Sequence, residues 1–160
     1  MQIRPLLSAD AAATRALFEG ERARHAYATR ALELIDIAAS QRDGEYSVLV
    51  AIESARVVGA VIFGMVAGAV GTGMIHGVTA ADGWRHRGIG RTLLASACAA
   101  LADAGARVAI AELPDDAVLA DVHRLLERAG FREESRAPDL VRDGVAIVFR
   151  RRELGAHRAH

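Results

Sequence analysis

The sequence contains no lysine and no asparagine, a single cysteine and few aromatic residues. All 20 basic residues are therefore arginines, and 20 acidic residues balance them to a net charge of 0. A Walker phosphate-binding loop needs a lysine on the phosphates, and Schiff-base catalysis needs a lysine amine, so both kinds of site are excluded. The neutral charge and an aromatic content of 4% also speak against binding to nucleic acid or to an anionic membrane.

The cysteine and histidine content bounds the chemistry further. Cys98 has no partner for an internal disulfide, so the fold does not depend on oxidation. It lies in the apolar stretch 94–101, which predicts a buried and unreactive side chain rather than a catalytic thiol. The six histidines show no spacing typical of a metal site, so we expect no bound metal.

No segment reads as a secretory signal or a membrane span. Residues 1–7 are followed by a polar, charged segment, unlike the apolar core of a signal peptide. The longest apolar run extends from Val57 to Ile75, but its glycines and β-branched residues favour two strands joined by a turn. We therefore expect a soluble, cytoplasmic protein.

The length bounds the number of domains. A chain of 160 residues with 52% hydrophobic residues can form one domain with a full core and is too short for two. No internal repeat or linker is visible. We expect a single domain over residues 1–152 and a frayed, charged tail over residues 153–160.

Hydrophobic periodicity predicts an α/β fold. The expected helices cover residues 10–20, capped by Asp10, and then 29–40, 88–104 and 116–129. The expected strands cover residues 3–5, 46–52, 57–63, 74–79, 108–113 and 145–150, with a hairpin turn at 53–56. The helix between the fourth and fifth strands requires those two to be parallel neighbours. The result is a mixed, mostly antiparallel sheet of six or seven strands flanked by about four helices.

A basic, glycine-containing segment, Arg85-His86-Arg87-Gly88-Ile89-Gly90, lies between the fourth predicted strand and the third predicted helix. A helix N-terminus presents unpaired N–H groups and the positive end of the helix dipole, which together bind phosphate. Two glycines would remove side chains that keep a diphosphate away, and Arg85, Arg87 and Arg91 would add positive charge. The alternative is a tight turn with solvated charges. A dinucleotide is disfavoured, because Leu93 stands where the third glycine of the dinucleotide fingerprint belongs.

This segment matches the R/Q-x-x-G-x-G/A motif of the GNAT superfamily of N-acetyltransferases, and the order of elements resembles that family over nearly the whole chain. Ala129-Gly130-Phe131 is similar to the family's ending of the fourth helix, and Ile3-Arg4-Pro5 to its opening. The resemblance implies a GNAT-like acyl-coenzyme A N-acyltransferase fold. It also implies transfer of an acetyl group from acetyl-coenzyme A to a primary amine of a small molecule or peptide, directly in a ternary complex.

The resemblance further implies which residues bind acetyl-coenzyme A. Backbone groups of Val78, Thr79 and Ala80 would pair with the pantetheine arm. Arg85 would open the diphosphate-binding segment, and the diphosphate would lie on the backbone of His86, Arg87, Gly88, Ile89, Gly90 and Arg91.

An amine attacks a thioester only in its neutral form, so a base has to accept its proton. Glu112 is the first candidate, since it lies at the C-terminal end of the fifth strand, at the edge where ligands bind in such sheets. Ribosomal-protein alanine acetyltransferases resemble this stretch, with a glutamate at the same strand end and a spacing to the Gly-Phe pair about two residues shorter. His76 is the second candidate, since it alternates with Met74 and Val78 along the fourth strand and a neutral imidazole accepts protons at physiological pH. The alternatives are a surface glutamate and a hydrogen-bonded core histidine.

The acid that protonates the leaving thiolate is missing from its usual place. Many family members use a tyrosine four residues before the glycine that ends the last helix, and that position is Leu126 here. His123, one turn earlier, is a candidate replacement, with an exposed helical histidine as the structural alternative and water as the other proton source. The family's asparagine before this helix is also absent, and the segment 114–116 takes its place.

Acidic residues in the segments expected to contact the acceptor favour a cationic amine, such as an aminoglycoside, a polyamine or a peptide N-terminus. They are Glu19, Glu21, Glu33, Asp36, Asp43, Glu45, Asp115, Asp116 and Asp121, although Arg22, Arg24, Arg30 and Arg42 lie among them. Two other functions stay open. One is a catalytically weak acetyl-coenzyme A sensor or accessory module, which Leu126 favours, and the other is a nucleic-acid binder. Exposed strands near the C-terminus are consistent with a homodimer.

Overall fold

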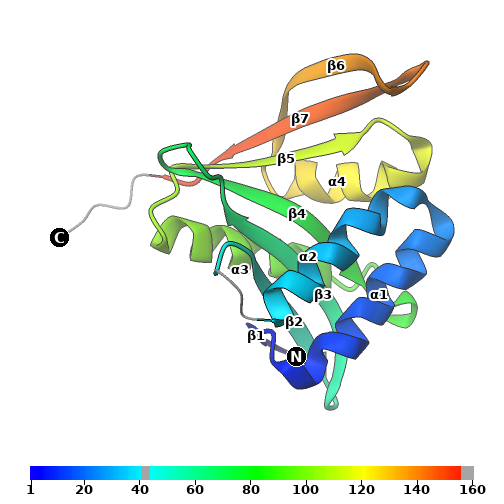
Figure 1. Ribbon diagram of the computed structural model, residues 1–160, viewed down its shortest axis with the longest axis vertical. Helices are drawn as coiled ribbons and strands as arrows, with labels where there is room; N and C mark the ends of the chain where they lie inside the picture. Colours follow the sequence, from blue (N-terminus) through cyan, green and yellow to red (C-terminus); the bar gives the residue numbers. More distant parts are fainter. Residues whose placement is uncertain (41–43, 156–160) are drawn as a thin grey trace.

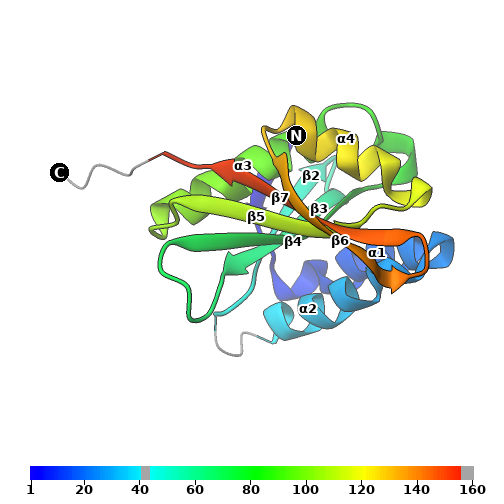
Figure 2. The same ribbon diagram turned by 90° about the horizontal axis from the view of Figure 1, so that it is seen from above.

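The computed structural model describes residues 1–40 and 44–155. Seven strands form one sheet in the order β1-β2-β3-β4-β5-β7-β6, with α1 and α2 on one face and α3 and α4 on the other (Figures 1 and 2). The strands are β1 Gln2–Pro5, β2 Ser47–Glu53, β3 Arg56–Met65, β4 Thr72–Ala80, β5 Val108–Pro114, β6 Arg132–Arg142 and β7 Val145–Glu153. The helices are α1 Ala11–Arg24, α2 Thr29–Ala39, α3 Ile89–Asp103 and α4 Ala120–Arg128. Among the strands of the described residues, only β4 and β5 pair in parallel, which confirms the predicted mixed and mostly antiparallel sheet.

Strands β6 and β7 and helix α1 differ from the predicted elements. Strand β6 was not predicted, because nearly all of its side chains are exposed and the sequence shows no alternation of polar and apolar residues. Strand β7 runs to Glu153, so the first residue assigned to the frayed tail belongs to the sheet, while residues 156–160 lie outside the described part of the chain. Helix α1 continues past Gly20 to Arg24.

Asp10 does not cap α1 through its side chain. Its carboxylate accepts a hydrogen bond from the backbone N–H of Leu7 at 2.9 Å and is paired with Arg4 at 2.6 Å. The predicted helix cap is therefore wrong, and Asp10 instead fixes the single turn that precedes the helix.

The sheet is buried on both faces at β2 and β3, which explains their nearly continuous apolar sequences. Phe18, Leu32 and Ile35 pack on one face, and helix α3 covers the other through residues such as Leu93 and Leu101. Helix α3 approaches the sheet closely because two strand positions are glycine. A Cβ on Gly59 would lie 2.7 Å from Ile89, and one on Gly73 would lie 2.5 Å from Leu101. Since Gly59 pairs with Ala80, the contact with Ile89 holds the start of α3 beside the end of β4, and the contact at Gly73 holds the other end of α3 beside the start of β4.

The two parallel strands diverge. Their pairing runs from Thr72–Val108 to Met74–Ile110 and then stops, although β4 continues to Ala80 and β5 to Pro114. A bulge in β4 accompanies the separation: Phe63 pairs with Ile75 and Ile62 with Gly77, which leaves His76 without a partner. The edges of β4 and β5 that face each other beyond this point are therefore unpaired with one another. We call this gap in the pairing the β4–β5 opening.

No helix among the described residues is long and apolar enough to cross a membrane.

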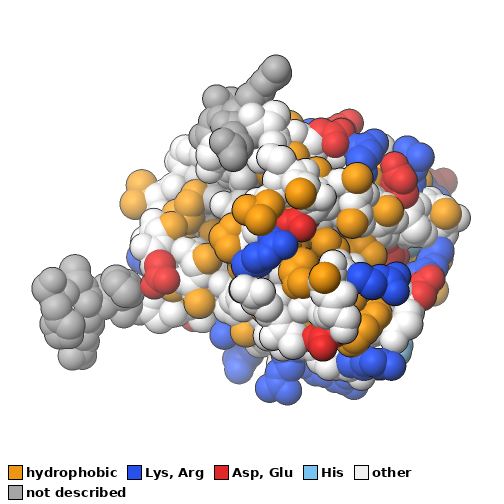
Figure 3. Space-filling view, turned by 90° about the horizontal axis from the view of Figure 1, so that it is seen from below, with side chains coloured by type: hydrophobic (Ala, Val, Ile, Leu, Met, Phe, Trp, Pro, Cys, Tyr) orange, Lys and Arg blue, Asp and Glu red, His pale blue; other side chains and the backbone are white. Residues whose placement is uncertain are grey.

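The first strand, β1, lies at the lower edge of the sheet in Figure 1. On the face of the molecule that is seen from below, hydrophobic side chains gather in the middle, with charged side chains among and around them (Figure 3).

Candidate active site

The start of α3 presents a run of unpaired backbone N–H groups. The N–H of Trp84 donates to Ala81 and that of Thr92 donates to Gly88, at 2.8 and 3.0 Å. Between them, the N–H groups of residues 86–91 have no acceptor among the described residues. His86 and Gly88 both adopt left-handed backbone angles, with φ of 60° and 81°, which bend this segment tightly. Unpaired N–H groups at a helix start bind anions, so the segment is suited to a phosphate or diphosphate.

The two glycines of this segment have different roles. Gly88 needs its left-handed conformation, and a Cβ there would meet no atom within 4 Å, so the outer side of the turn is open. A Cβ on Gly90 would instead lie 2.8 Å from Cδ2 of Leu125. The expectation that both glycines clear a path for a diphosphate is thus corrected for Gly90, which makes room for α4.

The arginines of the segment also differ. The guanidinium of Arg85 pairs with Glu21 and, at 3.1 Å, with Asp82, so its charge is already neutralised. Arg85 therefore links the segment to α1. The expectation from the sequence that it adds free positive charge at the phosphate site is corrected. Arg87 and Arg91 are exposed and form no ion pair among residues 1–40 and 44–155. Arg87 lies over the ring of Trp84, 4.9 Å from its centroid.

The end of β4 is anchored on one edge and unpaired toward β5 on the other. Val78, Thr79 and Ala80 pair with β3 through residues 59–61. The hydroxyl of Thr79 donates to Glu21 at 2.9 Å, so one carboxylate of α1 contacts both β4 and Arg85. The backbone predicted to bind the pantetheine arm therefore lies along the β4–β5 opening.

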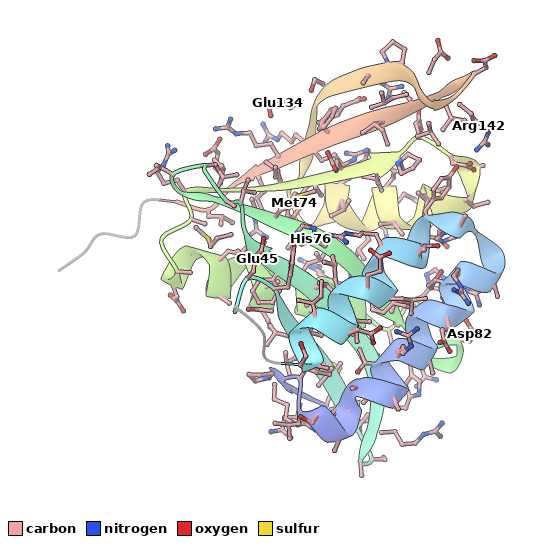
Figure 4. The ribbon with its side chains drawn as sticks, in the orientation of Figure 1. Glu45, Met74, His76, Asp82, Glu134 and Arg142 are labelled. Atoms are coloured by element: carbon pink, nitrogen blue, oxygen red, sulfur yellow. The ribbon has the colours of Figure 1, made fainter. Side chains whose placement is uncertain are left out.

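His76 occupies the bulge of β4, on the α2 side of the sheet. Its ring packs edge-on against Tyr46, with centroids 5.2 Å apart, and it lies near Glu45 (Figure 4). Burial and the charge of Arg30 lower the pKa of His76, and Glu45 partly offsets them, so the imidazole is neutral at physiological pH. The bulge corrects the predicted alternation, because Val78 packs against the core on the α3 side and does not share a face with His76.

Glu112 lies across the opening from His76. Its neighbours Ala111 and Leu113 are buried in the core on the side of α3 and α4, so Glu112 points to the opposite face, beside its cross-strand neighbour Phe149. Its carboxylate is exposed and forms no ion pair with any described residue. His76 and Glu112 each follow the last paired residues of their strand, Met74 and Ile110, on the same face of the sheet. The two predicted base candidates therefore flank the opening.

The sequence matches a family model described as "Acetyltransferase (GNAT) family" over residues 11–131. The chain belongs to the GNAT acetyltransferase family. No protein of curated function matches the sequence.

Solved structures agree with this family. A GNAT-family acetyltransferase of Desulfovibrio desulfuricans is 27% identical, with a TM-score of 0.85 over 96% of this chain and 99% of that one. The ribosomal-protein-alanine N-acetyltransferase of Brucella melitensis is 24% identical, with a TM-score of 0.77 over 96% and 99%. A Salmonella typhimurium acetyltransferase solved with acetyl-coenzyme A is 22% identical, with a TM-score of 0.75 over 100% and 97%. The latter two are similar in fold.

In this GNAT protein, His123 is not placed to act as an acid. Its Nε2 is 2.9 Å from the carbonyl oxygen of Pro114, and its Nδ1 is 3.3 Å from the guanidinium of Arg150. Because a carbonyl only accepts and a guanidinium only donates, these contacts match an Nε2–H that donates to the backbone and an Nδ1 that accepts from Arg150, so both ring nitrogens are engaged. Leu126, at the usual tyrosine position, is 2% exposed and belongs to the core.

Sequence reasoning missed one polar cluster near the opening. The hydroxyl of Tyr27 donates to Asp116 at 2.8 Å, and Arg142 donates to both, at 2.9 and 3.0 Å. The hydroxyl of Tyr27, the N–H of Val118 and Arg142 together lower the pKa of Asp116. The three residues are far apart in the sequence, and no local pattern links them. Of the three residues, only Asp116 stands out in the sequence, because an aspartate before a helix is a common capping residue.

Two hollows lie elsewhere. One of about 750 Å³ is lined by the ends of α2 and α3 and by residues of β2 and β3, away from the start of α3. The other, of about 270 Å³, lies beside α4 and includes His123 and Arg150. Neither includes the segment 85–91, His76 or Glu112. Among the described residues, no group of three or more histidine, cysteine or acidic side chains is placed to hold a metal.

Proposed function

We propose that this chain transfers the acetyl group of acetyl-coenzyme A to a primary amine of a small molecule or peptide, directly within a ternary complex. The amine nitrogen forms a bond to the acetyl carbon, the bond from that carbon to sulfur breaks, and the amine gives up a proton. The observation that carries the proposal is the run of unpaired N–H groups over residues 86–91, beside the unpaired edge of β4. Family membership and the Salmonella protein solved with acetyl-coenzyme A support it.

Acetyl-coenzyme A is the cosubstrate, and the residues of the α3 start fit its diphosphate. The segment offers N–H donors, open space beside Gly88, and the two arginines Arg87 and Arg91 that no carboxylate of the described chain neutralises. The pantetheine arm would lie along β4 at Val78, Thr79 and Ala80, whose edge toward β5 is unpaired. The thioester would then reach the stretch of the opening that His76 and Glu112 flank.

Glu112 is the proposed base, and His76 is the second candidate. Glu112 is exposed and is not engaged in an ion pair with a described residue. It lies on the face of the sheet that carries α1 and α2, which we propose as the acceptor side of the opening. His76 is neutral, as a base must be, but it is half-buried under Tyr46. With His123 engaged on both nitrogens and Leu126 in the core, water is the proposed proton source for the thiolate.

A cationic amine is the proposed acceptor, although fewer acidic residues support this proposal than the sequence suggested. Of the acidic residues predicted to contact the acceptor, Glu45 alone is both described and free of an ion pair with a described residue, and it lies near His76. Glu112, predicted as the base, adds a second unpaired carboxylate beside the opening. Asp43 and Arg42 lie outside the described residues. The other predicted acidic residues are ion-paired: Glu19, Glu21, Glu33, Asp36, Asp115, Asp116 and Asp121.

The second candidate function is an acetyl-coenzyme A sensor or accessory module with little turnover. Leu126 in the core and the engaged His123 favour it, because no side chain replaces the usual acid of the last helix. Both functions require the cofactor site, so turnover decides between them.

Trp84 is the only tryptophan in the chain and stacks under Arg87 in the diphosphate segment, so its fluorescence reports directly on this site. We expect saturable quenching or a spectral shift when coenzyme A or acetyl-coenzyme A is added. Release of free thiol is then followed over a panel of primary amines, including a polyamine, an aminoglycoside and a peptide with a free N-terminus. Binding without thiol release on any amine would favour the sensor. No response to either ligand at millimolar concentration would exclude both functions.

A further inference from the structure

Tyr27, Asp116 and Arg142 come from three different connections of the fold. Tyr27 lies between α1 and α2, Asp116 between β5 and α4, and Arg142 at the end of β6 beside its hairpin with β7. We propose that this cluster, the Tyr27 clasp, limits the size of the group that fits on the acceptor side of the β4–β5 opening. The proposal rests on the proposed function, because that function places the acetyl group and the amine there.

The clasp joins two halves of the sheet that no backbone ladder joins at this end. Beyond Met74 and Ile110, strands β4 and β5 are not paired with each other. Among the described residues, the hydrogen bonds of Tyr27 to Asp116 and from Arg142 are the ones that link the α1–α2 segment to the β5–β7 half. Figures 1 and 2 agree that the junction of α1 and α2 lies beside the connection from β5 to α4. The opening is therefore closed at one end by the β4–β5 ladder and at the other by the clasp.

The clasp is built as a firm contact. Asp116 is the shared acceptor, with 14% of its side chain exposed, and its second oxygen accepts from the N–H of Val118 at 3.1 Å. The carboxylate is thus held by its own loop while Tyr27 and Arg142 donate to it from the two other connections. Charge-assisted bonds of this kind are stronger than neutral ones, so the distance between the elements is fixed.

Glu112 lies between the two closures. On β5 it follows Ile110, where the ladder ends, and precedes Asp116, which belongs to the clasp. Across from it, His76 lies on the same face of β4. A group that reacts beside Glu112 or His76 is therefore bounded along the strands in both directions. The clasp restricts the size of this group and not its charge, because Arg142 and Asp116 neutralise each other.

The chain offers a matched control for the clasp. Arg136, also on β6, pairs with Asp115 at 3.0 Å, so it resembles Arg142 in charge, strand and partner. It makes its ion pairs with Asp115 and Glu133 and none with α1 or α2. Arg136→Gln therefore removes an equivalent surface ion pair and leaves the clasp intact.

The test uses coenzyme A and S-benzyl-coenzyme A, whose substituent on sulfur occupies the position of the acetyl group and extends toward the acceptor. Affinities are measured by Trp84 fluorescence. We expect the unaltered protein to bind S-benzyl-coenzyme A at least tenfold more weakly than coenzyme A. Tyr27→Phe and Arg142→Gln should each reduce that ratio at least fivefold, mainly by improving the benzyl compound, and Arg136→Gln should leave it within twofold.

An unchanged ratio in both clasp variants, an equal reduction in Arg136→Gln, or equal affinities in the unaltered protein would overturn the proposal. Arg142 is 59% exposed, so its variant keeps the test available if the Tyr27 variant does not fold. A protein that binds neither compound at millimolar concentration would contradict the proposed function itself, and the clasp proposal with it. That outcome is distinct, because it concerns unsubstituted coenzyme A.

Discussion

His76 and Glu112 flank the β4–β5 opening from opposite strands and differ in how they are held. Glu112 is exposed and free of ion pairs with described residues, so its carboxylate can reach an amine on the acceptor side. His76 is packed under Tyr46 in the bulge of β4, and its pKa is lowered first by burial. Both residues are candidates for the base because they flank the opening. The exposed Glu112 is favoured over the packed His76.

We predict that Glu112→Gln lowers kcat at least tenfold on any amine that the protein acetylates, because an amide of the same shape cannot accept a proton. The affinity for acetyl-coenzyme A, measured by Trp84 fluorescence, should stay within twofold. Unchanged turnover would transfer the role of the base to His76 or to water.

The pH dependence of turnover separates His76 from the other candidates. If His76 accepts the proton, kcat/KM should fall as the pH drops through its pKa, below the ordinary value of 6.5, since the neutral imidazole is the active form. The measurement is kcat/KM from pH 5 to 8 for the unaltered protein and for His76→Gln. Survival of the same acid limb in His76→Gln would show that another group titrates.

At the scale of elements, the start of α3 combines a ligand site with a packing contact. Gly88 gives the turn its left-handed angle, whereas Gly90 lets α4 approach through Leu125. Glu21 connects the same turn to α1 and to Thr79 of β4. Three elements thus fix the direction of the unpaired N–H groups.

We predict that Gly90→Ala lowers the free energy of unfolding by about 1 kcal/mol, because the new methyl group would lie 2.8 Å from the flexible end of Leu125. In a Leu125→Ala background the same substitution should cost clearly less, since the opposing atoms are gone. Urea unfolding of the four proteins measures both costs. An equal loss in the two backgrounds would refute the packing role of Gly90.

Much of the arrangement of elements could be predicted from the sequence, and the reasons differ by element. Apolar strands buried on both faces and helices ended by glycine gave clear local signals, as did the motif at residues 85–90. Strand β6 gave none, because both of its faces are largely exposed. The bulge at His76 was equally invisible, since it arises from the register with β3. Likewise, the pairing of Arg85 with Glu21 depends on tertiary contacts alone.

At the scale of the whole molecule, ion pairs involve most of the described acidic residues. Within residues 1–40 and 44–155, three aspartates have a lowered pKa, and in each a side-chain hydrogen bond is the largest cause: Asp10 with Arg4, Asp82 with Arg24 and Asp116 with Tyr27. Asp10 and Asp116 are mostly buried, and Asp82 is largely exposed and therefore screened by water.

We predict that stability changes little above about pH 7, falls as the unfolded His76 takes up a proton near its ordinary pKa of 6.5, and falls further as the aspartates are protonated. The unfolded aspartates have the higher pKa, near 3.8, and take up protons first, so acid shifts the equilibrium toward unfolding until the lowered native pKa values are passed. Thermal unfolding from pH 2.5 to 7 measures this, and Arg4→Gln should flatten the curve. A melting temperature that stays constant or rises from pH 5 to 3 would refute the prediction.

The most direct test of the cofactor site compares coenzyme A with pantetheine, which lacks the diphosphate, by amide chemical shifts in solution. If the backbone at the start of α3 binds the diphosphate, coenzyme A should shift the amide signals of residues 86–91 strongly. Pantetheine should leave these signals almost unchanged. Equal shifts with both compounds, or no shift at these amides with saturating coenzyme A, would contradict the site and the transferase function that depends on it.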